Sequence, residues 1–338
     1  MASALPLRAA LERGALLTVA NWPILVVEFA VESLFKFALA VPVVGGAFMV
    51  AVLMGADVTS LFDEGLQAAA NRVVGSLDTA PVALASFLLA VLIVACGGAL
   101  LMFGVKAGTL AVLASGERAA PDLRRGPLKI DWFRQAHAYD APTLLAGVKR
   151  FGRRAAMLGL WLGTAYVVTA LAYVALLRLA LRFSPGDPGG FAFWPLSIAF
   201  ATSAGLVAVA AINLAYDLLR VIVVLDDCRL RDAVRKLRGF VLTDARQVIG
   251  ILGVMGAVAI LATALAILVT AGLAFVGYVP IVGLIFLPLQ AAAWLVRGLV
   301  FQHVSLMTIA AYQTQYRRYA EPSEPGARPA AHLWVQRA

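Results

Sequence analysis

Three apolar stretches of this sequence contain polar side chains that recur at helical spacing. In the first stretch, Glu28, Glu32 and Lys36 follow i, i+4, i+8 spacing, which places them on one face of a helix. An ionisable group in hydrocarbon is costly unless it pairs with an opposite charge or lines a wet cavity. Such groups are therefore the first candidates for a binding or transport site within a membrane.

The other two stretches repeat this arrangement. Their polar residues follow i, i+3, i+7 spacing in one stretch and i, i+4, i+7 spacing in the other. We expect the acids of the first stretch and the bases of the other two to meet inside a helical bundle, where they form a cavity or a charge-paired core. The predicted binding cluster consists of Glu28, Glu32, Asn213, Tyr216, Arg220, Gln290 and Arg297.

A second interpretation needs no ligand. Glu32 can pair with Lys36, and Asp217 with Arg220, one turn along the same helix. Lys106 can extend its long side chain to the membrane interface. The sequence leaves both interpretations open.

Basic residues near the ends of the apolar stretches form a second predicted set. Lys and Arg beside a bilayer attract anionic headgroups. The predicted contacts to anionic phospholipid are Lys106, Arg150, Arg153, Arg154, Arg235, Lys236 and Arg238.

The sequence contains no recognisable catalytic arrangement. It has no Gly-x-x-x-x-Gly-Lys-Ser/Thr loop, no His-Glu-x-x-His and no Gly-x-Ser-x-Gly. Its three histidines, His137, His303 and His332, are far apart along the chain, and its two cysteines are Cys96 and Cys228. We therefore predict no catalytic residue, no metal site and no cofactor, and we do not expect an enzyme.

The composition requires lipid as the solvent for much of the chain. Of 338 residues, 62% are hydrophobic and only 14% are charged, with a mean hydropathy of +0.88. The net charge of +9 lies between the apolar stretches. There, topology and anionic lipid explain it without nucleic acid. The predicted fold class is an all-α polytopic membrane protein.

Six stretches are long enough to cross a bilayer, for which about 20 apolar residues suffice. We expect residues 1–320 to form a single transmembrane domain and residues 321–338, which are rich in Pro, Glu, Gly and Ala, to form a disordered cytoplasmic tail. The predicted crossings are residues 19–55, 82–103, 155–179, 193–224, 248–274 and 282–309.

Charge distribution decides the topology. Residues 19–55 could cross twice, but two crossings would put the basic loop of residues 106–154 opposite to the other basic segments. We therefore predict one kinked or re-entrant crossing, with the kink near Pro42, and the acidic segment of residues 57–81 outside. Both termini are then cytoplasmic. The Ala, Arg, Gly and Val bias is typical of a GC-rich bacterial genome, so we expect the bacterial inner membrane.

Similar basic segments precede the odd-numbered crossings. They start at Leu7, Leu145 and Leu230 and share small, apolar and basic residues. They predict three parallel hairpin repeats, each preceded by a basic interfacial helix. We expect the first, residues 7–18, to lie at the membrane surface. The alternative is that any polytopic protein needs basic residues at these places.

This layout resembles that of six-crossing bacterial membrane families that include the membrane domain attached to some glycerophosphodiester phosphodiesterases. The resemblance consists of the order of the apolar stretches and the basic segment of residues 233–238 that enters a crossing. The phosphodiesterase catalytic domain itself has no counterpart in this sequence. No catalytic residue is therefore implied.

Two functions fit these features. The first is a carrier or lipid-handling protein whose polar interior opens to the cytoplasmic leaflet and whose partners are the bilayer and its anionic phospholipids. The alternative is a non-catalytic membrane scaffold or accessory subunit that docks a cytoplasmic protein partner.

Overall fold

The computed structural model describes residues 6–45, 81–120, 130–181, 190–277 and 280–320, and every regular element in these ranges is a helix. The predicted outer segment near residues 57–81 and the predicted tail lie outside the described residues, apart from Pro81. The helices are α1 (Leu7–Ala20), α2 (Trp22–Ala40), the π-helical turn η1 (Val41–Gly45), α6 (Pro81–Ala119), α7 (Ile130–Ala136), α8 (Ala141–Leu181), α9 (Gly190–Asp226), α10 (Leu230–Gly277) and α11 (Pro280–Ala320).

The structure confirms the predicted all-α polytopic membrane fold. Five helices, α6 and α8 to α11, are each long and apolar enough to cross a membrane. The pair α1 and α2 meets the same test as one broken span, bent by 76° at Asn21. A bend was predicted near Pro42, where the π-helical turn η1 lies. The sharp bend at Asn21 was not predicted.

The basic connection predicted for residues 106–154 is largely helical, and α6 extends well beyond the predicted end of its crossing at residue 103. Helix α6 continues through Lys106 to Ala119, and α8 already begins at Ala141. Residues 107–119 are rich in Ala and Leu, which favour a helix. Most of them are also buried among other helices. Packing therefore extends the helix well past the end of the apolar span.

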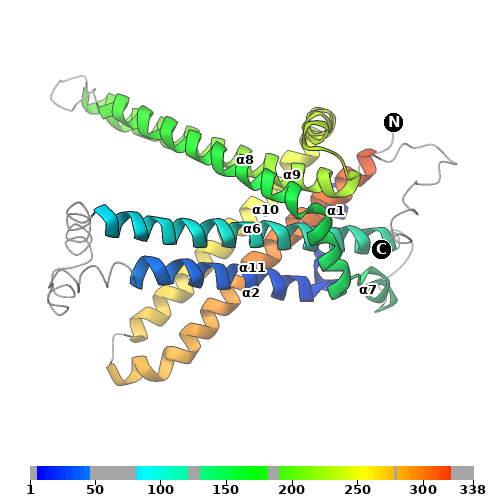
Figure 1. Ribbon diagram of the computed structural model, residues 1–338, viewed down its shortest axis with the longest axis horizontal. Coiled ribbons are helices and arrows are strands. Elements are labelled where there is room, and N and C mark those ends of the chain that lie inside the picture. The colour runs from blue at the N-terminus through cyan, green and yellow to red at the C-terminus, as the bar shows by residue number, and fades with distance from the viewer. Residues whose placement is uncertain (1–5, 46–80, 121–129, 182–189, 278–279, 321–338) are drawn as a thin grey trace.

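The spanning helices pair as three hairpins: α2 with α6, α8 with α9, and α10 with α11 (Figure 1). Phe35 of α2 closely contacts Gly98 of α6, and Tyr173 of α8 contacts Gly205 of α9. The hairpins converge at the end where α1 and α7 lie and separate toward the opposite end. We call these the basic end and the far end.

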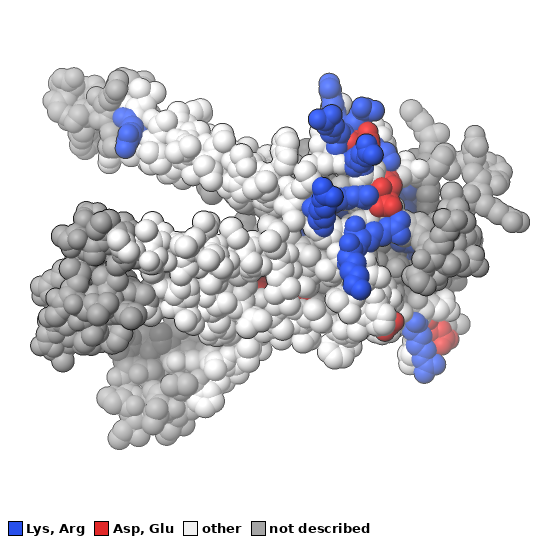
Figure 2. Space-filling view, in the orientation of Figure 1, with Lys and Arg blue, Asp and Glu red and all other residues white. Residues whose placement is uncertain are grey.

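The buried core lies at the basic end. It includes the last turns of α6, α9 and α11 and the first turns of α8 and α10, with Leu110, Phe151, Ile222, Phe240 and Tyr316 among its fully buried side chains. Lys and Arg side chains gather over the same end, whereas the surface toward the far end is almost uncharged (Figure 2). The bundle is thus held together where it leaves the lipid.

The last turns of α11 are the most deeply buried part of this core. All eight residues from 309 to 316 are at most 4% exposed, which leaves this stretch of helix no solvent face. Helices α1, α2, α6, α9 and α10 all contact α11. A helix buried on every side normally carries apolar residues, yet this one carries Tyr312, Gln313, Thr314, Gln315 and Tyr316.

Helix α1 packs one face against the rest of the protein, a contact that was not predicted for it. Ala10, Arg13, Gly14 and Leu17 are buried, and α1 packs mainly against α11. A Cβ atom on Gly14 would lie 2.8 Å from the carbonyl oxygen of Met307. Only glycine lets the two helices approach this closely.

The first and third hairpins share a detail that supports the predicted repeat. Asn21 separates α1 from α2 with φ −111° and ψ 36°, and Asp244 interrupts α10 with φ −115° and ψ 27°. Asn21 comes as many residues after Leu7, the first residue of α1, as Asp244 comes after Leu230, the first residue of α10. In both hairpins a short basic helix therefore precedes a bend and then a spanning helix.

We predict that Gly14→Ala destabilises the protein by about 1–3 kcal/mol, the typical effect of overpacking. The added methyl group would meet backbone atoms of both Met307 and Ala311, so α1 and α11 must move apart. Thermal unfolding of the purified protein measures the change. Gly253→Ala is the control, because nothing lies within 4 Å of a Cβ atom there. Equal stability of the two variants would contradict the packing described.

Candidate functional site

The charged residues of α8 give the level of the bilayer. Residues 155–177 carry no charge, and Arg154 and Arg178 flank them. The flanking residues are about 36 Å apart along the helix, enough to cross a hydrocarbon core of about 30 Å. Gly152 of α8 packs against Gly104 of α6, so Lys106, two residues farther along, lies at the level of the Arg150 to Arg154 charges. Lys106 therefore marks the membrane boundary on α6.

A cavity of about 470 Å³ lies between α2, α6 and α11 near this level. Its wall includes three basic side chains and one acidic one, together with three aromatic rings. The lining residues are Phe29, Glu32, Ser33, Lys36, Lys106, Trp294, Arg297, Gly298, Phe301, Gln302 and Ser305. The structure thus brings Glu32 and Arg297 of the predicted binding cluster to one cavity, together with Lys106 of the predicted lipid contacts.

The acid in this cavity is already paired. Glu32 forms an ion pair with Lys36 at 2.7 Å and accepts a hydrogen bond from the side-chain amide of Gln302. Among the described residues, no carboxylate lies within ion-pair distance of Lys106 or Arg297. These two cations are therefore the groups that an anion in the cavity would meet.

Glu28 lies behind the cavity, one turn before Glu32. Its side chain is buried at 5% exposure and accepts a hydrogen bond of 2.5 Å from the hydroxyl of Thr109. The positive charges of Lys106 and Arg220 act on its carboxyl group. Glu28 thus joins the cavity to a second group of charges on α9.

Arg220 is the centre of that second group. It is 4% exposed, forms an ion pair of 2.8 Å with Asp217, and its guanidinium lies over the ring of Tyr216 at 5.2 Å. Its Nε atom has no hydrogen-bond partner. Asp217 and Arg220 therefore pair on the same helix, as predicted by the interpretation that needs no ligand. This pairing leaves the buried Nε donor of Arg220 without a partner.

Two members of the predicted cluster lie elsewhere. Asn213 accepts a hydrogen bond from the Tyr166 hydroxyl within the α8–α9 hairpin. The Gln290 amide donates to the Leu273 carbonyl within the α10–α11 hairpin, at 3.4 Å. The polar stripes share helical faces as predicted, but separation of the hairpins keeps their far ends from meeting.

Two of the predicted lipid contacts, Arg150 and Arg154, bind a carboxylate of the protein. They pair with Asp227 at 2.6 Å and 2.5 Å. Asp227 follows α9 with a positive φ of 47°, a conformation that Asp tolerates. Partial burial favours the protonated form of Asp227, but hydrogen bonds and charge from the two arginines outweigh it and hold the pKa of this carboxyl below its usual value.

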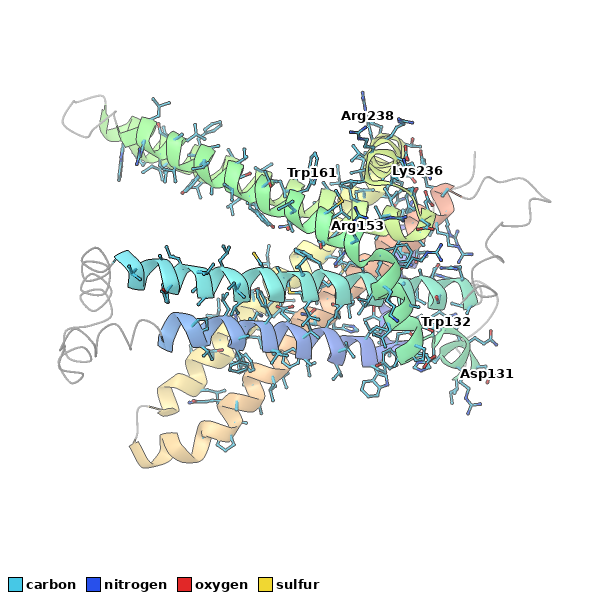
Figure 3. The ribbon with its side chains drawn as sticks, in the orientation of Figure 1. Asp131, Trp132, Arg153, Trp161, Lys236 and Arg238 are labelled. Atoms are coloured by element: carbon cyan, nitrogen blue, oxygen red, sulfur yellow. The ribbon has the colours of Figure 1, made fainter. Side chains whose placement is uncertain are left out.

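The other basic residues of α8 and α10 lie on the outside of the same end. Lys236 pairs with Asp226 at 2.5 Å, whereas Arg153, Arg235 and Arg238 are exposed. Arg153, Lys236 and Arg238 lie on one side of the basic end (Figure 3). These residues are placed to contact either headgroups or a partner at the membrane surface.

A buried ion pair between α1 and α6 was missed at the sequence level. The Nε atom of Arg13 donates to both carboxylate oxygens of Glu117 at 2.8 and 2.9 Å, and both side chains are less than 10% exposed. Arg317 of α11 donates to the backbone carbonyl of Glu117 at 3.1 Å. A signal was present, because Glu117 is the single acidic residue of α6.

Polar groups at the end of α11 were also missed. The Tyr316 hydroxyl donates to Asp226 at 2.6 Å, and Gln315 donates to Asp244 at 3.4 Å. Tyr312 and Gln313 are buried with side-chain atoms that lack a partner. The run Tyr-Gln-Thr-Gln-Tyr after an apolar span is typical of an exposed helix end, so only tertiary packing reveals its burial.

Among the described residues, no group of three or more His, Cys, Asp or Glu side chains could hold a metal ion. His137 contacts the backbone carbonyl of Ala20 at 2.7 Å through Nδ1. Next to it, Asn21 accepts a hydrogen bond from the amide of Ala138. This histidine therefore helps to hold the bend between α1 and α2.

Comparison with family models, with curated proteins and with solved structures finds no match for this chain. The resemblance to the membrane domain of glycerophosphodiester phosphodiesterases stays a prediction. What can be stated is the class: an integral, polytopic, all-α membrane protein.

We predict that Glu117→Gln destabilises the protein by about 3–5 kcal/mol, because it removes the carboxylate that neutralises the buried charge of Arg13. Glu12→Gln is the matched control. Glu12 pairs with Arg8 on the exposed side of α1, the helix that carries Arg13. Solvent screens an exposed ion pair, so its loss should change stability little. Denaturant unfolding in detergent measures both variants, and the double variant Arg13→Met/Glu117→Leu should recover stability. Equal effects of the two single variants would refute the buried pair.

We predict a pH dependence for Asp227. Because its folded-state pKa lies below the usual value of 3.8, its ion pairs stabilise the protein fully above that value. This stabilisation is lost as the pH falls through the folded-state pKa. The difference in melting temperature between wild type and Asp227→Asn should therefore stay constant from neutral pH to about pH 5 and shrink below about pH 4. A difference that grows on acidification would contradict the assignment.

Proposed function

We propose that the protein is a lipid-handling membrane protein that binds an anionic phospholipid in the cavity between α2, α6 and α11. The observation that carries this proposal is the composition of the cavity wall. Lys36, Lys106 and Arg297 face one acid, Glu32, so the wall has a surplus of positive charge. Within the part of the chain that the structure describes, neither Lys106 nor Arg297 forms an ion pair with a carboxylate.

The cavity wall is also amphipathic. Phe29, Trp294 and Phe301 line it alongside the charges, and Trp294 packs against Phe29 and Phe37 of α2. A small inorganic anion would use only the charged part of such a wall. A phospholipid uses both parts, because its phosphate suits the basic side chains and its acyl chains suit the aromatic rings.

The depth of the cavity supports the same ligand. Lys106 lies at the membrane boundary, where phosphates of the leaflet are found. Lys and Arg gather at the basic end, and by the positive-inside rule this end faces the cytoplasm. The proposal therefore places the protein in the bacterial inner membrane, with both termini and the cavity entrance on the cytoplasmic side.

The test is lipid retention by purified protein. Wild type and the variant Lys106→Gln/Arg297→Gln are titrated in neutral detergent with phosphatidylglycerol and, separately, with phosphatidylcholine, and bound lipid is read by native mass spectrometry. We expect wild type to prefer the anionic lipid and the variant to bind it at least about tenfold more weakly. The loss of two charge-assisted contacts accounts for this change.

Arg178→Gln is the matched control, since Arg178 is a basic residue at the far end of α8. It should bind lipid like wild type. Equal affinity of wild type for the two lipids, or equal affinity of wild type and the cavity variant for phosphatidylglycerol, would overturn the proposal.

The exposed arginines of α8 and α10 favour a second function, a membrane scaffold that docks an acidic cytoplasmic partner. Arg153, Arg235 and Arg238 extend from the basic end without lining the cavity. Co-purification of a stoichiometric partner that is lost in Arg235→Ala/Arg238→Ala, with no preference for anionic lipid in wild type, would favour the scaffold.

A further inference from the structure

Polar side chains continue beyond the charges of the basic end along the α8–α9 hairpin, at depths where helices normally present apolar residues to lipid. On α9 they are Thr202, Asn213 and Arg220, and on α8 they are Tyr166 and Tyr173. We call these five residues the polar track. They lie between the charged residues that flank the hydrocarbon core.

Helical geometry puts the α9 members of the track on one face. Separations of 11 and 7 residues return a helix to within about 20° of its starting direction at 100° per residue. Thr202, Asn213 and Arg220 therefore form a line about 27 Å long at 1.5 Å per residue. That length is close to the thickness of the hydrocarbon core.

The α8 members add hydroxyl groups beside this line. The Tyr166 hydroxyl donates to the Oδ1 atom of Asn213, and the Tyr173 hydroxyl lies 3.3 Å from that of Thr202. Tyr166 and Tyr173 are two turns apart on α8 and so share a face. Both helices of the hairpin thus contribute to the same polar surface.

Exposure rises along the track from the basic end to the far end. Arg220 is 4% exposed, whereas Asn213 and Thr202 are exposed. The same face of α9 that is buried against other helices at the basic end is therefore uncovered farther along. This change follows from the separation of the hairpins toward the far end (Figure 1).

Hydrogen bonds between two helices can by themselves stabilise a membrane hairpin. The polar track has more hydrogen-bond donors than the contacts between α8 and α9 engage. Asn213 engages its oxygen with Tyr166, and its amide nitrogen donates to no described residue. The Nε atom of buried Arg220 has no partner either. Uncovered donors at hydrocarbon depth need water or a polar ligand, because lipid tails accept no hydrogen bond.

The track connects with the lipid cavity through charges. Arg220 acts on Glu28, and Glu28 is in turn acted on by Lys106, which lines the cavity. Arg220 itself is buried, so the groups of the track that a headgroup can meet beyond the cavity are the exposed side chains of Asn213 and Thr202. Acyl chains can stay in the surrounding bilayer, since the flanking residues of α8, such as Val167 and Leu171, are exposed and apolar.

We propose that the polar track carries the headgroup of a phospholipid across the bilayer, so that the protein moves lipid between leaflets. This inference rests on the proposed function, because it takes the lipid-binding cavity as the entrance. To lipid binding in the cavity, the inference adds a route for the headgroup and a kind of transport, movement of lipid between leaflets. Headgroups pass along the α8–α9 hairpin while the tails remain in lipid, and no enclosed passage through the protein is required.

The experiment uses liposomes that contain the full-length protein and phosphatidylglycerol with a fluorescent headgroup. A membrane-impermeant reductant quenches the outer leaflet, and further quenching measures movement from the inner leaflet. We expect wild-type liposomes to quench beyond the outer-leaflet fraction, and Asn213→Leu/Thr202→Val to slow this phase at least about tenfold. Thr270→Val is the control, because Thr270 is an exposed spanning residue of α10 whose hydroxyl binds the Ala266 carbonyl of its own helix.

The outcomes separate this inference from the proposed function. Movement in wild type that survives in the Asn213→Leu/Thr202→Val variant, or no movement in wild type, overturns the inference. Retention of phosphatidylglycerol in detergent would in either case still support the cavity. Thermal unfolding of each variant confirms that it is folded, and Tyr166→Phe, which removes one hydroxyl without changing packing, should slow movement if the double variant fails to fold.

Discussion

The fold depends on burying the polar end of α11 among the charged ends of its neighbours. Residues 309–316 have no solvent face, and ionic groups surround them. Arg317 binds the Glu117 carbonyl of α6, and Tyr316 binds Asp226 at the end of α9. Glu117 and Asp226 each also pair with a base on α1 or α10. These contacts need specific partners, so they fix one arrangement of the helices at the basic end in a way that apolar contacts in lipid cannot.

Because the attachment is at one end, the rest of each hairpin can separate from the others. Within the membrane, the spanning windows of α6, α8 and α10 bury at most 11% of their residues inside the protein. Lipid then covers helix surfaces that would be buried in a compact bundle. Polar groups on these surfaces are exposed to lipid or water. The cavity at Lys106 and Arg297 and the polar track of α8 and α9 both result from this shape. One constraint on packing thus accounts for the site and for its access to lipid.

The sequence was sufficient for the class of fold, because about 20 apolar residues in a row leave few alternatives to a spanning helix. It also indicated Glu32, Lys106 and Arg297, since charges near hydrocarbon are conspicuous. It did not indicate the burial of Gln313, because helix ends rich in polar residues are normally solvated. Glu117 stood out as the single acid of α6, but local sequence did not indicate its partner Arg13. The environment of these residues is created by α1 folding back at Asn21. Pro23 at the start of α2 marks this helix boundary locally, but no local signal shows where α1 then packs. The separation of the hairpins also depends on tertiary packing and leaves no mark in local sequence.

The most direct test of this account is the distance between α6 and α8 at two depths, measured by electron paramagnetic resonance between spin labels in nanodiscs. Cys96 and Cys228 are first replaced by serine. One label pair is placed at Leu101 and Leu160, near the contact of Phe103 with Gly159, and the other at Leu89 and Val168, toward the far end. The account predicts a short, narrow distribution for the first pair and a longer, broader one for the second. Equal distances at both depths would show a closed bundle and would contradict it.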